Sequence, residues 1–310
     1  MADFKLNGIT PDGLGKIKLG SVDVQEIYMG STLVWPISSP PGPCTGYLFA
    51  DKAELQQAVN LWYLYPTYAE SVYGEINTWC TQNVTDMSEL FLDKTDFNDN
   101  ISNWDVSNVT NMYKMFWEAE SFNQNISSWD VSSLINMEYM FFRAYDFNQP
   151  IGTWDVSNVT NMVRTFQNAQ SFNQNINSWD VSGVINMQEM FFGCFMFDQP
   201  LDNWDTSSVT NMSFMFDAAA IFNQDITNWN TGNVSSMRSM FANTDAFNQP
   251  IGSWNTSNVT NMTTMFANAD VFNQNLTGWC VTLISSEPSN FSLNCPLTQA
   301  NKPVWGTCPP

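Results

Sequence analysis

The amino-acid sequence predicts an α/β repeat solenoid, with one short parallel strand and one short helix in each 25-residue coil, and a small N-terminal β module. The period itself is the first observation. Tryptophan recurs without insertion or deletion at Trp79, Trp104, Trp129, Trp154, Trp179, Trp204, Trp229, Trp254 and Trp279. The second observation is that apolar residues recur at +2, +5, +8, +11, +12, +15, +18 and +22 after each tryptophan. Stacked coils would bury these columns against one another without any ligand.

Each coil, counted from its tryptophan, divides into an expected helix and an expected strand. The second coil has the spacing of one face of a short helix at Met112, Met115, Phe116 and Ala119. The strand is expected around the tryptophan, because the pattern I-x-x-W-x-V-x-x-L that begins at Ile126 has the spacing of a leucine-rich-repeat strand. The repeats are therefore expected to form a leucine-rich-repeat-like solenoid.

The repeated motif F-N-Q-[ND]-I-x-x-W-[DN]-V-S-x-V-T-N-M-x-x-M-F covers roughly residues 75–280. It resembles the repeat of the BspA-like surface proteins, the DUF285 family. The resemblance implies a leucine-rich-repeat-like solenoid, carried by bacterial surface proteins and by phage and other viral proteins. It also implies a role in adhesion or recognition.

The sequence divides into five segments: a β-rich anchoring module at 1–36, a Pro-rich linker at 37–45, an N-terminal cap at 46–78, the repeats at 79–279 and a C-terminal cap at 280–310. Caps are expected because the open ends of a solenoid would otherwise expose its core. A helix in the N-terminal cap is expected to place Leu55, Val59 and Trp62 on one face.

The anchoring module alternates apolar and polar residues between glycines, as small antiparallel strands with tight turns do. Its segment G-K-I-K-L-G-S-V-D-V-Q-E-I-Y-M-G-S-T-L-V-W-P resembles a stretch near the start of various phage structural proteins. This resemblance implies that residues 1–36 attach the chain to other virion structural proteins, or pack with copies of themselves as a homo-oligomer. A segment this short has too little core to be stable alone, which favours packing on another chain.

Charge and composition exclude several classes of function. The chain has a formal net charge of −20, and the repeats at 79–279 hold 21 acidic and 5 basic residues, a net charge of −16. Nucleic acid is not an expected partner, because binding its phosphates needs Lys and Arg. The chain has no histidine and no nucleophile, metal or nucleotide-binding motif, so we expect no enzyme, no cofactor and no metal. No run of ~20 apolar residues is present, so no membrane span is expected.

The candidate ligand-binding residues, which we call the +1 row, each follow a repeat tryptophan. They are Asp105, Asp130, Asp155, Asp180, Asp205, Asn230 and Asn255. On a strand they would point away from the core, where neighbouring aspartates repel one another. A glycan, a peptide or Ca²⁺ could occupy such a row, although no dedicated Ca²⁺ loop motif is present. The alternative is structural, because Asx side chains readily cap the backbone N–H groups of a following turn.

The six cysteines form no metal motif, and four of them bracket the ends of the repeats. Two pairs would each fasten a cap to the repeats, in keeping with an oxidising, extracellular destination: Cys44 with Cys80, and Cys280 with Cys308. Cys295 is either left over or replaces one partner of the second pair. Cys194 stands in a column otherwise held mostly by alanine, and is expected to be a buried free thiol.

These observations favour a non-enzymatic virion-associated protein of a phage, either a head or tail fibre protein or a decoration protein. Residues 1–36 would anchor it on the virion surface, and the acidic repeats would be displayed for recognition of a host-surface glycan or protein. No signal peptide is apparent, as expected for a virion protein released by lysis. A bacterial cell-surface adhesin of the same repeat family, located outside the cell, is the alternative. A glycoside hydrolase would need two carboxylates in unlike environments, which repeat-equivalent aspartates do not provide.

Overall fold

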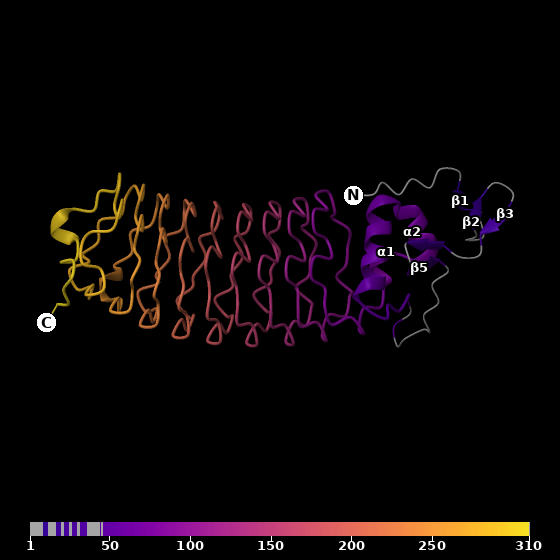
Figure 1. The fold of residues 1–310 in the computed structure, drawn as a ribbon, viewed down its shortest axis with the longest axis horizontal. Coiled ribbons are helices and arrows are strands. Elements are labelled where there is room, and N and C mark those ends of the chain that lie inside the picture. Colours follow the sequence, from indigo (N-terminus) through magenta and orange to yellow (C-terminus); the bar gives the residue numbers. More distant parts are fainter. Residues whose placement is uncertain are drawn as a thin grey trace.

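A computed structural model describes residues 9–11, 17–19, 22–24, 27–29, 32–35, 44 and 46–309. The 25-residue coils stack in one long row, with two helices at one end and the C-terminus at the other (Figure 1). Neighbouring coils are joined by backbone hydrogen bonds along the whole row.

The β-strands all lie before the repeats. They are β1 (Ile9–Pro11), β2 (Ile17–Leu19), β3 (Val22–Val24), β4 (Ile27–Met29) and β5 (Thr32–Trp35). Strands β1, β2 and β3 form an antiparallel sheet in that order, and β4 pairs with β5 in antiparallel fashion. The other residues of the predicted anchoring module, and the predicted linker apart from Cys44, lie outside the described residues.

Two helices precede the first coil and cover its end. Helix α1 (Lys52–Leu64) is capped at its N-terminus by Asp51, whose side chain accepts a hydrogen bond from the backbone N–H of Glu54 at 3.0 Å. Helix α2 (Pro66–Tyr73) starts with its proline and ends at Gly74, whose φ of 76° suits glycine. Trp62 of α1 packs edge-on against Trp79, with ring centroids 5.7 Å apart. The 3-10 helix η1 (Ile76–Thr78) then leads into the first coil.

The predicted strand and helix of each coil are wrong. Residues 80–279, all of which the structure describes, contain no β-strand and no α-helix, and their one helical turn is the 3-10 helix η2 (Ile251–Ser253). Neighbouring coils meet instead at isolated parallel bridges seven residues after each tryptophan, as between Asn111 and Asn136. The expected leucine-rich-repeat-like α/β architecture is therefore replaced by stacked coils that consist of turns.

Left-handed backbone conformations exclude a helix from the middle of each coil, where one was predicted. The residues at +10 and +14 have positive φ, as at Lys114 (55°) and Glu118 (54°). The N–H groups at +8, +10, +12 and +14 donate to carbonyls of the next coil, as from Phe116 to Met140 at 2.8 Å. The N–H groups between them mostly donate three residues back, as from Met115 to the carbonyl of Met112 at 3.1 Å. The apolar steps of three and four residues thus arise from successive tight turns.

The apolar columns form one continuous core. The repeat tryptophans are each at most 4% exposed. From Trp104 onward, each indole Nε1 donates to the backbone carbonyl 28 residues earlier, three residues before the preceding tryptophan, as from Trp179 to Ile151 at 3.0 Å. The phenylalanines at +12 stack on one another, as Phe116 does on Phe141 with centroids 5.5 Å apart. Each coil therefore contributes little core of its own and is stabilised by its neighbours.

Residues 280–309 leave the 25-residue period and cover the other end of the stack. The backbone N–H of Val281 donates to Thr307 at 2.8 Å, which returns the tail to the last coil. Phe291 packs edge-on against Phe266, with centroids 5.4 Å apart, and Trp305 packs against Phe291. The segment includes the 3-10 helix η3 (Gln299–Asn301). Among the described residues, no helix has the length and apolar character needed to cross a bilayer.

Candidate binding surfaces

The +1 row is exposed, but it lies in turns rather than on strands. At Asp130, Oδ1 accepts the backbone N–H of Ser132 at 3.0 Å and the Ser132 hydroxyl at 2.6 Å. The bond from the N–H two residues later recurs along the row, at Asp105, Asp155, Asp180, Asp205, Asn230 and Asn255. One oxygen of every member of the row therefore stabilises its own turn.

Hydrogen bonding outweighs repulsion between these aspartates. The hydroxyl and N–H of Ser132 hold the pKa of Asp130 below its usual value, and the charge of Asp155 opposes them only weakly. The pKa values of Asp155 and Asp205 are lowered by serines in the same way. Within the described part of the chain, no hydrogen bond reaches the Oδ2 oxygen of an aspartate in the row. These free oxygens could contact a ligand hydroxyl or a cation.

The Asn-Gln pair at +19 and +20 joins neighbouring coils, a role that the sequence pattern did not indicate. Asn123 Oδ1 accepts the backbone N–H of Asn148 at 3.0 Å, and Gln149 Nε2 donates to the Asn123 carbonyl at 2.8 Å. The F-N-Q motif thus places one aromatic ring in the core and two amides between coils. Its recurrence reflects stacking rather than ligand binding.

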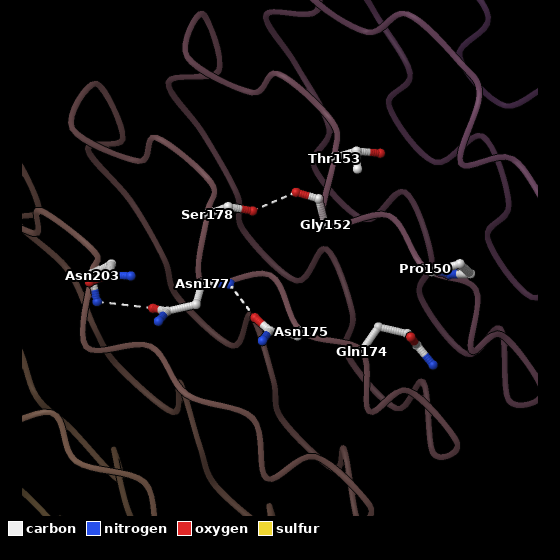
Figure 2. Close-up of a pocket in the computed structure, with 8 residues that line it drawn as sticks. All are labelled: Pro150, Gly152, Thr153, Gln174, Asn175, Asn177, Ser178 and Asn203. Atoms are coloured by element: carbon white, nitrogen blue, oxygen red, sulfur yellow. Dashed lines mark hydrogen bonds between the residues drawn. The ribbon is translucent and has the colours of Figure 1, made fainter.

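An open polar depression of about 520 Å³ lies where residues shortly before the tryptophans reach the surface (Figure 2). Its lining residues are Pro150, Gly152, Thr153, Gln174, Asn175, Asn177, Ser178 and Asn203. A Cβ at Gly152 would come within 2.3 Å of the Asn175 carbonyl oxygen, so only glycine fits there. The lining groups bond one another, as Ser178 Oγ does to the Gly152 carbonyl at 2.6 Å. None of them is an acid or a base, so the depression offers no proton-transfer chemistry.

The residues at +9 to +15 of each coil, which we call the turn face, contain every basic residue of the repeats. These are Lys94, Lys114, Arg143, Arg164 and Arg238. Arg143 pairs with Glu118, and Arg164 with Glu189, each with a nitrogen–oxygen distance of 2.8 Å. An array with a net charge of −16 thus gathers its positive charge in one segment of the coil.

Aromatic side chains gather on the same face in the coils that begin at residues 104 and 129. Trp117 stacks on Phe142 with centroids 3.8 Å apart and lies 5.2 Å from Tyr139. The Lys114 ammonium lies 4.4 Å from the Trp117 ring centroid, 5.1 Å from that of Tyr113 and 5.7 Å from that of Tyr139. The repeat pattern did not indicate this cluster, because the pattern consists of columns shared by all coils and these residues change from coil to coil. The sequence does place all five basic residues of the repeats at +9 to +15, and this confinement could have pointed to the cluster.

Two buried carboxylates lie farther along the turn face. Glu189 is 8% exposed and accepts hydrogen bonds from Arg164 and from Gln167 Nε2, the latter at 3.0 Å. Asp217 is equally buried and accepts from Asn243 Nδ2 at 2.7 Å. Burial raises the pKa of Asp217 to about 6. Both carboxylates are held within the protein by their neighbours.

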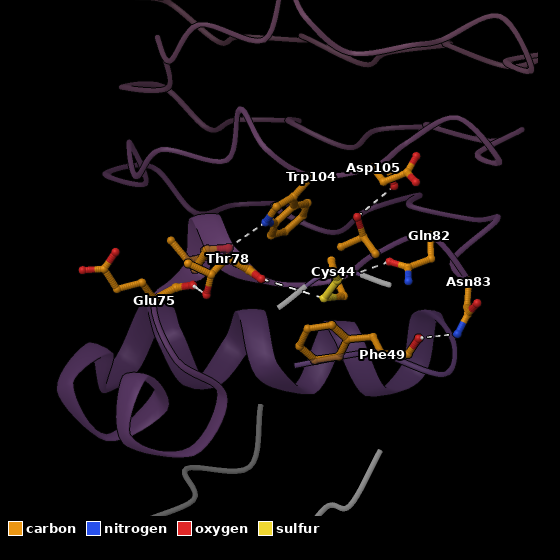
Figure 3. Close-up of a disulfide and its surroundings, with 11 residues drawn as sticks. Cys44, Phe49, Glu75, Thr78, Gln82, Asn83, Trp104 and Asp105 are labelled. Atoms are coloured by element: carbon orange, nitrogen blue, oxygen red, sulfur yellow. Dashed lines mark hydrogen bonds between the residues drawn. A yellow bond between two sulfur atoms is a disulfide. The ribbon is translucent and has the colours of Figure 1, made fainter. Parts of the chain in front are cut away.

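The structure joins Cys44 to Cys80 and Cys280 to Cys308, and leaves Cys194 and Cys295 as free thiols. Figure 3 shows the first disulfide beside Phe49 and the start of the first coil. Burial raises the pKa of the Cys194 thiol, which donates to the Phe166 carbonyl at 2.9 Å. In the described ranges, no three His, Cys, Asp or Glu side chains are grouped so that they could hold a metal ion.

Comparison with known proteins identifies one family. The sequence model of that family, described as "Mycoplasma protein of unknown function, DUF285", matches residues 59–177 and again 163–279. Together the matches cover 59–279, which is 221 of 310 residues. No curated protein and no solved structure matches the chain.

Proposed function

This chain belongs to the DUF285 family of repeat proteins, and from that premise we propose that it is a non-enzymatic recognition protein displayed outside the cytosol. One observation carries the proposal. Polar residues that recur in every coil hold the stack together, as Asn123 and Gln149 do, whereas the residues that vary from coil to coil are mainly at +9, +10, +13 and +14 of the turn face and at +16 and +17 just after it. This division is expected of a scaffold that presents a surface to a partner.

The carboxylates favour binding over catalysis. Asp130, Asp155 and Asp205 share one environment, in which serine lowers the pKa of each. Acid–base catalysis by carboxylates instead needs two groups whose environments push their pKa values apart. Asp217 has a raised pKa of about 6, but it is buried and held by Asn243, which favours a structural role.

The two disulfides support a location outside the cytosol, because disulfides persist in oxidising compartments. The finer proposal is a phage virion protein that residues 1–36 anchor on the particle surface. Those residues hold three Lys and four acidic residues, a net charge of −1, against −16 for the repeats. The near-neutral module suits packing on another protein, and the acidic stack would resist self-association. An adhesin on a bacterial cell surface is the alternative location.

Binding of the labelled full-length chain to intact bacterial cells tests the recognition role. We expect saturable binding by flow cytometry, and loss of that binding after periodate oxidation of surface glycans or after protease treatment of the cells. Binding to no cell type, or binding that neither treatment removes, would refute the recognition of a surface glycan or protein.

Deletion of residues 1–36 tests the anchoring role. The truncated protein should still bind cells but should no longer sediment with gradient-purified particles, whereas the full-length chain should do both. Truncated protein that still associates with particles would show that the anchor lies elsewhere. A full-length chain found on bacterial cells but never on particles would favour the adhesin.

A further inference from the structure

We propose that the turn face of the coils beginning at Trp104, Trp129 and Trp154 is a binding site for an acidic oligosaccharide. The inference rests on the recognition role proposed above and names its ligand class. The aromatic–basic patch, as we call the site, comprises Tyr113, Lys114, Trp117, Tyr139, Phe142 and Arg164. Columns +10 and +13 of consecutive coils supply most of it, so the stacking register brings these residues together.

The rings of the patch form a platform beside the core rather than within it. The core already holds complete phenylalanine columns at +12 and +18. Tyr113, Trp117 and Tyr139 are only partly buried, and Trp117 is held by its stacking on Phe142. A partly exposed aromatic cluster of this kind is a candidate interaction site. One face of Trp117 is covered by Phe142, and the Lys114 ammonium lies over three of the rings, so a ligand would meet mainly ring edges and this ammonium. Rings fixed in this way lose little conformational entropy on binding.

Lys114 supplies the charge preference. In the described part of the chain, its ammonium contacts the faces of three rings and makes no hydrogen bond or ion pair, whereas Arg143 and Arg164 are each paired with a glutamate. An ammonium has three N–H donors, so Lys114 can still donate to a ligand carboxylate or sulfate. In the three coils, positions +9 to +15 hold three basic and two acidic residues, and Glu189 of the next coil pairs with Arg164, so the local net charge is zero against −16 for all the repeats. An anion is therefore repelled less here than by the rest of the stack, and Lys114 is the cation left to bind it.

The spacing of the coils favours a saccharide chain over an acidic peptide. The coils repeat every 5.5 to 5.6 Å, measured between the buried core rings of Phe116, Phe141 and Phe166. This repeat is close to the length of one pyranose unit, so successive sugars can meet successive coils. An extended peptide repeats at roughly 3.3 Å per residue and does not match the coils in this way.

Calorimetric titration of the full chain with three hexasaccharides tests the site: hexagalacturonate, a heparin hexasaccharide and neutral cellohexaose. The wild type should bind the two acidic probes about tenfold more tightly than cellohexaose. Lys114→Met keeps the apolar stem and should remove that preference, without weakening cellohexaose. Trp117→Ala should weaken all three probes about tenfold or more. Arg238→Met is the matched control, because Arg238 also lies over a ring of the turn face, 5.1 Å from Phe214, but outside the patch.

Thermal melting of each variant shows whether it is folded, and Lys114→Arg should restore the acidic preference. The inference is overturned if Lys114→Met binds the probes like the wild type, or if Arg238→Met loses as much of the acidic preference as Lys114→Met. It is also overturned if the wild type prefers the neutral probe or binds no probe. Hexaglutamate binding as tightly as the acidic sugars would also overturn it. Cell binding that survives in Lys114→Met and Trp117→Ala would leave the recognition role standing while this site fails.

Discussion

Replacement of Trp179 separates the hydrogen bond of the tryptophan column from its packing. Trp179 is 2% exposed, and its Nε1 donates to the Ile151 carbonyl at 3.0 Å. Trp179→Phe removes this bond, while the carbonyl keeps the bond from the Trp154 backbone N–H at 3.1 Å, and should lower the free energy of unfolding by about 0.5–1.5 kcal/mol. Trp179→Ala also empties the volume of the ring and should cost about 3–5 kcal/mol. Trp305→Phe is the control, because Trp305 Nε1 is buried without a partner among the described residues, so this change breaks no hydrogen bond and should cost clearly less than Trp179→Phe.

Urea unfolding followed by circular dichroism measures these differences. Trp79→Ala should cost less than Trp179→Ala, because Trp79 lies at the end of the stack and donates to Gly74 of the helical cap rather than to another coil. Equal losses for Trp79→Ala and Trp179→Ala, or for Trp179→Phe and Trp305→Phe, would refute the view that inter-coil bonding of the column stabilises the stack.

Three further predictions concern the +1 row, the buried carboxylate and the free thiol. Asp180→Ala should lower stability by about 1 kcal/mol, and Asp180→Asn should not, because asparagine keeps the Oδ1 acceptor; similar losses would contradict the capping role. Burial raises the pKa of Asp217 from its ordinary value of 3.8 to about 6 in the folded protein, so the folded state holds its proton more tightly than the unfolded state and stability falls as pH rises from about 4 to 6. The free energy of unfolding of Asp217→Asn should therefore exceed that of the wild type by up to about 3 kcal/mol at pH 7. The exposed control Asp146→Asn should show no such difference, and a difference for Asp217→Asn that does not change with pH would contradict this explanation. Cys194 should resist alkylation at pH 8 until urea unfolds the chain, and a disulfide to Cys194 in a non-reduced peptide map would contradict its place in the core.

The period and the buried columns could be predicted from the sequence because both depend on residue type alone. The conformation of the coil could not. Met112, Met115 and Phe116 have steps that suit a helical face and a series of tight turns equally well. The two are distinguished by the left-handed residues at +10 and +14, such as Lys114 and Glu118, whose side chains give no sign of that conformation. Each left-handed residue costs roughly 1–2 kcal/mol of conformational energy. The backbone hydrogen bonds to the next coil offset this cost only once the coils have stacked.

The candidate binding residues likewise divide into those that local sequence predicts and those that depend on contacts between coils. The +1 row was predicted as either a ligand ladder or a set of caps, and the structure shows one oxygen of each residue in a cap. Local sequence favours caps because an Asx turn needs only two neighbouring residues. The aromatic–basic patch depends instead on contacts such as that of Trp117 with Phe142, which are 25 residues apart and meet only through the register of the stack.

The two disulfides also decide how the molecule would respond to tension. A pull on the N-terminus passes from Cys44 directly to Cys80, and a pull on the C-terminus passes from Cys308 to Cys280. Both caps therefore lie outside the path of the force, and the coils between Cys80 and Cys280 bear it. Each 25-residue coil that opens would lengthen the chain by roughly 85 Å, at about 3.4 Å per residue. A chain anchored at one end and attached to a surface would thus extend in steps of one coil while its caps stay folded, and reduction of the disulfides would bring the caps into the path of the force.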